Sequence, residues 1–246
     1  MKKLLSTLAC VACLSTVATA DFLRIEAGAG AWMQTPSGGL EASIVGNPGS
    51  DVSSEIQQTE GYVWVMVKHF VPIVPNLRVE YVSVKNEGSA SGKFTDDFTA
   101  TGKTSLDMTQ YDIIPYYNLL DNTFWITVDV GIDLKMVEMD YKAEDGTANG
   151  YSDSFSAPIP MLYLRARTEL PLTGFGAEAD VKYISYSDTT VYDIRIKLDY
   201  TLDFIPVIQP ALEVGYRMQK FESNELDDVN LNLDYAGVYA GLMLRF

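Results

Sequence analysis

The sequence predicts an all-β protein: a transmembrane antiparallel up-and-down β-barrel of about ten strands, with eight strands as the alternative. Three observations support this prediction. The end of the chain alternates between apolar and other residues, the start of the chain looks like an export signal, and several segments between them alternate in the same way. A period of two places the alternating residues on opposite faces of a strand.

The C-terminal segment 231–246 has the clearest alternation. Counted back from the final aromatic residue, every second residue suits lipid: Leu244, Leu242, Ala240, Val238 and Ala236. Free chain ends normally fray, whereas this one ends on a bulky residue of the apolar face. The tail resembles the C-terminal recognition signal of bacterial outer-membrane β-barrels, with matching residues Tyr239, Gly241, Leu244 and Phe246. The resemblance implies that periplasmic chaperones and the barrel assembly machinery are partners during assembly.

The N-terminal segment 1–20 is interpreted as a signal peptide. A short basic start is followed by an apolar stretch and by a small-residue cleavage site, Ala18-Thr19-Ala20. The mature domain is then 21–246, a length that suits one barrel. A lipoprotein box at Cys10 is the rival interpretation, but it leaves an apolar core of about six residues, below the roughly 7–15 expected. Both cysteines fall within the signal, so no disulfide is expected.

Further segments between the two ends show the same alternation. Runs of six or more alternations exceed an ordinary strand of about five to six residues and suit a tilted membrane strand of about nine to eleven. The predicted strands are 23–33, 61–69, 77–84, 110–117, 124–135, 162–170, 175–185, 191–202, 211–220 and 231–246. A water-soluble β-sandwich alternates too, with its apolar face inside. The two chain ends favour the membrane barrel over the sandwich.

The connections between strands are expected to alternate in length. Short turns are predicted at 70–76, 119–123, 170–174 and 204–207. Longer polar loops are predicted at 34–57, 86–105, 143–154 and 222–230. Short periplasmic turns and longer outer loops are typical of bacterial barrels, so both chain ends are placed on the periplasmic side. Pro158 and Pro160 fall in the sixth strand, where a bulge or a late strand start is expected.

Charged residues are expected to face the barrel interior, because the apolar residues face lipid. The inward acids are Glu26, Glu80, Asp112, Asp129, Asp133, Glu169, Glu178, Asp180, Asp193, Asp199 and Glu213. The inward bases are Arg24, Arg78, Lys135, Arg165, Arg167, Lys182, Arg195, Lys197, Arg217 and Arg245. Isolated buried charges cost several kcal/mol, so these groups should pair. The main interpretation is a structural salt-bridge network that fills a narrow barrel, and the alternative is a polar conduit.

The formal net charge of −15 becomes −17 without Lys2 and Lys3 of the signal, and most of this negative charge is expected to lie in the outer loops. A solvated surface is the simplest interpretation of the loop acids, and divalent cations that bridge to lipopolysaccharide are the alternative. No basic patch or nucleic-acid motif is visible, so nucleic acid is a poor partner. The expected surroundings are outer-membrane lipids and lipopolysaccharide. No cofactor or metal site is predicted, because no motif for one is found.

No catalytic residue is assigned. The single histidine, His69, lies beside a turn on the predicted periplasmic side, and no serine has a nucleophile-elbow motif. The protein is therefore expected to be non-enzymatic, with a structural or narrow-pore role. A loop-mediated adhesin or receptor is the alternative function.

Four segments carry a resemblance to a family. These are DFLRIEAGAGAWMQTPSGG, GYVWVMVKHF, VPIVPNLRVEY and the terminal GLMLRF. Together they resemble an uncharacterised family of small Gram-negative outer-membrane β-barrel proteins, over the whole mature chain. The shared features are glycines, aromatic residues and turns, so the resemblance implies a fold and a location and supplies no catalytic or binding residue.

Overall fold

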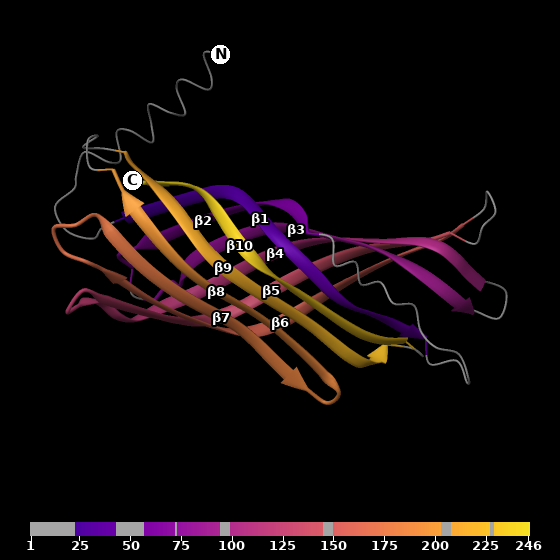
Figure 1. Cartoon of the computed structure of the whole chain (residues 1–246). Coiled ribbons are helices and arrows are strands. Elements are labelled where there is room, and N and C mark those ends of the chain that lie inside the picture. The colour runs from indigo at the N-terminus through magenta and orange to yellow at the C-terminus, as the bar shows by residue number, and fades with distance from the viewer. Residues whose placement is uncertain are drawn as a thin grey trace, which may run out of the picture.

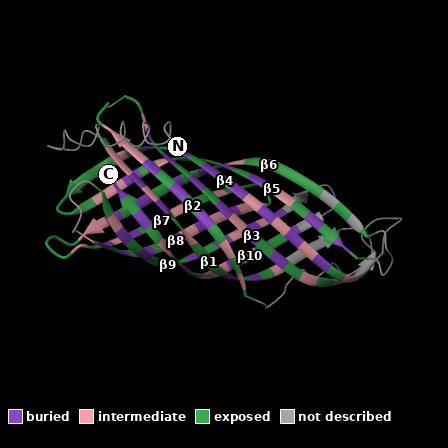
Figure 2. Cartoon of the chain, turned by 90° about the horizontal axis from the view of Figure 1, so that it is seen from above, coloured by how far each residue is buried: buried purple, intermediate pink, exposed green. Residues whose placement is uncertain are grey.

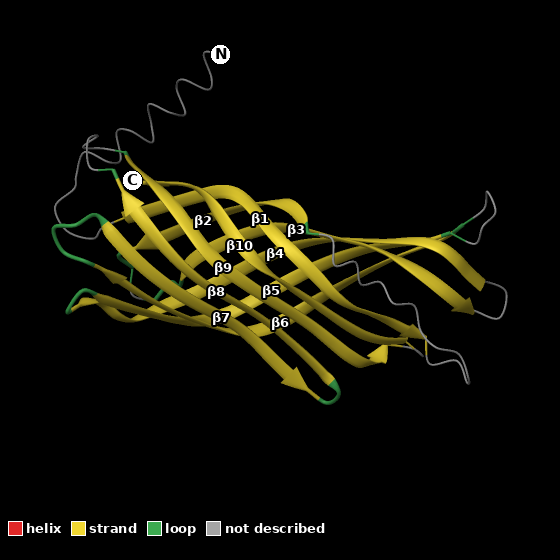
Figure 3. Ribbon diagram, viewed as in Figure 1, coloured by secondary structure: helices red, strands yellow, loops and turns green. Residues whose placement is uncertain are grey.

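The computed structural model describes residues 23–42, 57–71, 73–93, 99–144, 150–202, 208–226 and 229–246. The predicted signal segment 1–20 lies outside the described residues, so its cleavage stays a prediction. Strands and short turns make up the described chain (Figure 3). Within those ranges, no helix has the length and apolar character needed to cross a membrane.

Ten antiparallel strands close into one barrel, in which each strand pairs with its neighbours in the chain and the last strand pairs with the first (Figure 1). The strands are β1 (Leu23–Ala42), β2 (Gln58–His69), β3 (Asn76–Lys93), β4 (Thr99–Thr123), β5 (Ile126–Ala143), β6 (Tyr151–Glu169), β7 (Phe175–Tyr186), β8 (Thr189–Thr201), β9 (Gln209–Leu226) and β10 (Val229–Arg245). The predicted fold class and the count of ten are confirmed, and the alternative count of eight is wrong. In the part of the barrel where all ten ladders are formed, closure leaves no free sheet edge.

The two ends of the barrel differ. The C-terminal Phe246 and the short turns β4–β5 and β6–β7 lie at one end, here called the inner end (Figure 1). The longest strands project at the opposite, outer end. Because short turns are typically periplasmic in bacterial barrels, the inner end corresponds to the predicted periplasmic side.

Burial alternates along the strands with a period of two (Figure 2). On β5, Val130, Ile132 and Leu134 are exposed on the outside, whereas Asp129 and Asp133 are buried inside. A water-soluble sandwich would bury the apolar residues and expose the charges. The observed arrangement is the reverse, so the sandwich interpretation is wrong for this part of the chain.

The outward apolar side chains form a belt around the barrel. On β5 this apolar belt covers residues 126–136, close to the length of a tilted membrane strand, about nine to eleven residues. Aromatic pairs mark both margins: the rings of Tyr81 and Tyr111 lie 5.4 Å apart at the outer margin, and those of Phe175 and Tyr200 lie 4.7 Å apart at the inner margin. Two such aromatic girdles are typical of membrane-spanning barrels.

Several strands continue beyond the outer margin of the belt, and this part is here called the outer extension. It includes residues 35–42 of β1, 83–93 of β3, 137–143 of β5 and 220–226 of β9. The predicted loops 34–57, 86–105, 143–154 and 222–230 are therefore too long, because much of each is strand. Apart from residues 57, 144 and 150, the remaining parts of these loops lie outside the described residues.

The polarity of the two strand faces inverts in the outer extension. On β5, Glu138 and Asp140 face outward, whereas Val137, Tyr141 and Ala143 are buried inside. Beyond the hydrocarbon region the surrounding solvent is water, so apolar side chains are more stable inside. The outward residues of these stretches are polar, so the sequence analysis assigned parts of them to loops.

The outer extension separates into two sheets with an apolar core. The β2–β3 ladder covers only residues 62–67 and 77–82, and the β6–β7 ladder covers only 162–169 and 176–183. Strands β3–β6 therefore diverge at the outer end from the sheet that contains β9, β10 and β1 (Figure 1). Buried residues of both sheets belong to one apolar cluster, including Val84, Leu106, Val137, Phe221 and Leu233.

The two prolines of β6 do not disturb the strand. Pro158 and Pro160 lie opposite Met136 and Leu134 of β5, in a register that runs without a shift. The expected bulge or late strand start is therefore wrong. The β6–β7 ladder begins only at Leu162, so both prolines lie on a stretch without a partner strand on the β7 side, where a missing N–H is tolerated.

Candidate functional site: the charged interior

The interior of the barrel holds a dense set of buried charges. The buried acids are Glu26, Glu80, Asp112, Asp129, Asp133, Glu178, Asp180, Asp193, Asp199 and Glu213. The buried bases are Arg78, Lys135, Arg165, Arg167, Lys182, Arg195, Lys197, Arg217 and Arg245. Two further predicted residues lie at the inner rim, where Arg24 Nη2 is 2.7 Å from Glu169 Oε1 and both side chains are partly exposed. All the charges predicted to face inward thus lie in the interior or at its rim.

The barrel register brings opposite charges together. Asp129 lies opposite Arg165 across the β5–β6 ladder, and their side chains meet at 2.5 Å. Asp180 lies opposite Arg195 across the β7–β8 ladder, at 2.8 Å. Such cross-strand pairs follow from the two-residue period, because both partners point to the same face.

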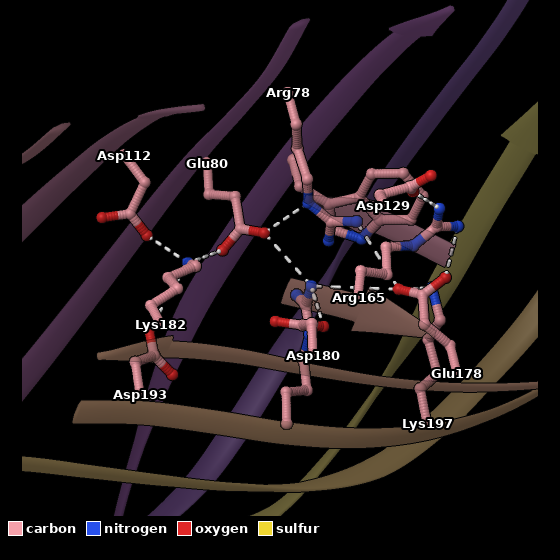
Figure 4. A network of polar contacts seen from close by, with 12 residues as sticks. Arg78, Glu80, Asp112, Asp129, Arg165, Glu178, Asp180, Lys182, Asp193 and Lys197 are labelled. Carbon is pink, nitrogen blue, oxygen red and sulfur yellow. Dashed lines mark hydrogen bonds and ion pairs between the residues drawn. The ribbon is translucent and has the colours of Figure 1, made fainter. Parts of the chain in front are cut away.

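Lys182 joins three strands on one side of the interior (Figure 4). Its Nζ donates to Glu80 Oε2 of β3 at 2.7 Å and to Asp112 Oδ2 of β4 at 2.5 Å. The neighbouring Lys135 also donates to Asp112, at 2.7 Å, and Arg217 of β9 donates to Asp193 at 2.5 Å. The contacts cross the interior of the barrel and tie distant strands together.

Glu178 collects the bases on the other side of the interior. Its Oε2 accepts hydrogen bonds from Arg165 at 2.7 Å and from Arg167 at 3.3 Å. Its Oε1 lies 3.5 Å from Arg78 and 3.3 Å from Lys197. One carboxylate therefore compensates four buried cations from strands β3, β6 and β8.

Aromatic rings fill the space between these charges. The ring of Trp64 lies 4.8 Å from the guanidinium of Arg78 and 4.6 Å from Lys197 Nζ, and its Nε1 donates to Glu213 at 3.2 Å. Glycine at position 28 provides the room, because a Cβ there would lie 2.4 Å from Trp64 Nε1. The sequence analysis missed Trp32 and Trp64 as interior residues. Trp32 could have been found, because it lies an even number of residues after the inward Glu26 on the same strand.

A narrow void lies between the packed side chains of the interior. The void lined by Trp32, Tyr62, Arg195, Arg217 and Tyr239 is too narrow to hold a water molecule. Small barrels are expected to have interiors packed by side chains, whereas open channels appear near sixteen strands. Around this void, the interior is packed with paired charges and aromatic rings.

Asp133 is the exception within the network. It is completely buried, and neither carboxylate oxygen has a hydrogen-bond partner among the described residues. The expectation that every inward charge pairs is therefore wrong for this residue. Its cross-strand neighbour on β6, Met161, is apolar.

The predicted assembly-signal residues lie along the seam between β1 and β10. Phe246 N donates to Ile25 O at 2.9 Å, and Leu244 faces outward in the belt. Tyr239 is buried inside, with its ring packed edge-on against Tyr62 at 5.4 Å. Gly241 leaves space for the Tyr62 hydroxyl, which would lie 2.3 Å from a Cβ at that position. These contacts close the barrel, and recognition by an assembly machinery stays a prediction.

Deleting Phe246 is expected to lower the amount of folded protein in the outer membrane. The deletion removes both backbone hydrogen bonds to Ile25 and the aromatic end of the predicted signal. The measurement is heat-modifiable mobility in isolated membranes, with Phe246→Tyr as the matched control. An unchanged yield would show that this residue is not needed for assembly.

No metal site is apparent in the described part of the chain. No cluster of three or more His, Cys, Asp or Glu side chains suited to a metal ion occurs there. His69 lies at the inner end, where its Nδ1 accepts from the Val71 N–H at 3.2 Å and its Nε2 lies 3.1 Å from Pro75 O. The contacts of the imidazole fix the β2–β3 turn.

The closed fold, the apolar belt and the buried charges define the class of this protein: an integral β-barrel of the outer membrane. Membrane lipids are therefore the surroundings of the belt. No protein-family model matches the sequence, and no curated protein matches it either. The suspected family thus stays a resemblance.

Solved structures with a similar fold are outer-membrane barrels. The translocator domain of the autotransporter NalP from Neisseria meningitidis is 13% identical, with a TM-score of 0.45, over 100% of this chain and 96% of that chain. Ail, the attachment invasion locus protein of Yersinia pestis, is 8% identical, with a TM-score of 0.39, over 92% and 100%. The toluene transporter TbuX of Ralstonia pickettii is 7% identical, with a TM-score of 0.36, over 92% and 90%. At these identities the likeness concerns the fold alone.

Proposed function

We propose that this chain is a non-enzymatic, structural barrel of the outer membrane that conducts no ions and holds a rigid β-structure at the cell surface. The observation that carries this proposal is the interior, which is packed with paired charges and aromatic rings, and whose void beside Arg195 and Arg217 is too narrow for a water molecule. The barrel assembly machinery, periplasmic chaperones and lipopolysaccharide are partners within the same proposal.

The geometry favours a structural role over a narrow pore. Ions could cross only if contacts such as Lys182–Glu80 and Arg165–Glu178 opened together. Breaking one partner of a buried pair costs about 3–5 kcal/mol, because the other charge stays uncompensated. Several such pairs lie in series along the interior, so thermal opening is rare.

Planar-bilayer recording tests the absence of conduction. The refolded mature protein is expected to give no current steps in concentrated potassium chloride, although it inserts. Insertion is checked separately by heat-modifiable mobility of protein in vesicles prepared in the same way. Reproducible steps of constant size would contradict the proposal and restore the narrow-pore interpretation.

Surface adhesion or reception is the second candidate function, and the outer extension favours it. Strands β3–β6 stand beyond the apolar belt with polar outer faces, such as Lys85, Glu87, Glu138 and Asp140, over a buried apolar core. A packed extension is a better platform for binding than flexible loops, because less ordering is needed on contact. Replacing these four outward residues with serine should abolish a binding phenotype while insertion persists.

A further inference from the structure

The short turns at the inner end expose large apolar side chains. Ile73 in the β2–β3 turn is 86% exposed, Phe124 in the β4–β5 turn is 85% exposed, and Leu172 in the β6–β7 turn is fully exposed. Each described turn at this end thus carries an apolar residue at its tip. Turns in contact with water are normally polar, so these three tips point to a nonaqueous contact.

The backbone at two of these tips gives an independent indication. Phe124, Trp125 and Leu172 have φ angles of 53°, 65° and 66°. This left-handed region suits glycine or asparagine and is unfavourable for bulky residues. Asn122, with φ of 48° at the end of β4, is the ordinary choice for this conformation. Strained positions filled by bulky apolar residues indicate a function of the side chains, because the turn geometry alone would favour other residues.

The same surface is almost free of charge. Within the described residues of 70–75, 119–125 and 170–174, Asp121 is the single charged side chain. Its carboxylate lies 2.6 Å from Lys68 Nζ, so this charge is compensated. The apolar turn surface also continues into the apolar belt, because Leu119, Leu120 and Phe175 are exposed beside the tips.

We propose that the inner end of the barrel is seated in the membrane, with the turn tips at the boundary between headgroups and acyl chains of the inner leaflet. Phospholipid fits this surface, since the surface is apolar, carries no uncompensated charge and adjoins the lipid-facing belt. Aromatic residues such as Phe124 and Trp125 prefer that depth. The tips fix how deeply the barrel sits and therefore how far the outer extension stands above the membrane.

Trp125 offers a direct test, because it is the exposed tryptophan, whereas Trp32 and Trp64 are buried in the interior. The mature protein is folded into vesicles of phosphatidylethanolamine and phosphatidylglycerol, with and without lipids brominated near the headgroup. Subtracting the emission of Trp125→Phe isolates the Trp125 signal. We expect bromolipid to remove most of this signal and iodide, present on both sides of the vesicles, to leave most of it.

A triple variant with polar tips, Ile73→Ser, Phe124→Asn and Leu172→Asn, completes the experiment. Heat-modifiable mobility confirms that the variant folds, and we expect its Trp125 to become accessible to iodide and to lose most of its bromolipid quenching. Strong iodide quenching of Trp125 in the unmodified protein, with no effect of bromolipid, would overturn the proposal in favour of a periplasmic contact. Equal bromolipid quenching in both proteins would also overturn it. Neither readout depends on whether the barrel conducts.

Discussion

Replacing Glu178 with glutamine is expected to lower the free energy of unfolding by about 3–5 kcal/mol. Its carboxylate lies within 3.5 Å of Arg78, Arg165, Arg167 and Lys197. Glutamine keeps the shape of the side chain but removes the charge, so buried cations stay uncompensated. Unfolding by urea in phospholipid vesicles, followed by tryptophan emission, measures the change.

Two matched variants show whether the effect comes from pairing. Asp133→Asn removes a buried carboxylate of the same interior that has no partner among the described residues, so the free energy of unfolding should stay the same or rise. Glu222→Gln breaks a partly exposed pair with Lys220, 3.0 Å away, which is worth about 0–1 kcal/mol. If Glu178→Gln unfolds at the same urea concentration as these two, the network does not stabilise the barrel.

Replacing Ile132 with arginine is expected to cost about 2–4 kcal/mol, because Ile132 faces lipid near the centre of the apolar belt. In the folded barrel, the arginine side chain at this depth would lie in hydrocarbon, which solvates a charge much more poorly than water or headgroups do. Unfolding by urea in phospholipid vesicles measures the change in the free energy of unfolding. This change should be larger in vesicles with thicker bilayers.

Glu138→Arg is the control for Ile132→Arg on the same face of the same strand. Glu138 lies in the outer extension between Thr109 and Ser156, where water is the solvent. Its substitution should change the free energy of unfolding by less than about 0.5 kcal/mol. Equal losses for both variants would show that the belt and the outer extension share one environment, which would contradict the assigned margin of the membrane.

The strand count and the closed fold could be predicted from the sequence because both rest on one rule. Within the belt, every second residue faces lipid, and the strands 124–135 and 191–202 show this directly. The inward charges followed from the same rule. The outer extension could not be predicted in this way, because the apolar residues change face at Met136 and Val137, where the solvent changes from lipid to water.

The partners within the interior were beyond sequence reasoning. Lys182 of β7 meets Glu80 of β3 across the barrel, and this contact depends on the diameter and the strand tilt rather than on the order of residues. The position of Trp64 also requires knowledge of its neighbour, since glycine at position 28 on β1 provides the space. Asp133 has no hydrogen-bond partner among the described residues, and Met161 is its cross-strand neighbour on β6; that register is not visible in the sequence.

The pairing of β1 with β10 has a consequence for biogenesis. Hydrocarbon provides no hydrogen bonds, so an unfinished sheet with eight or nine strands would hold two rows of bare peptide groups in the bilayer, each group costing several kcal/mol. Insertion and ring closure must therefore be coupled, and partly synthesised or clipped chains gain little from entering the membrane. Pairing of the first strand with the last therefore selects for complete chains, because only a closed barrel is stable in the membrane.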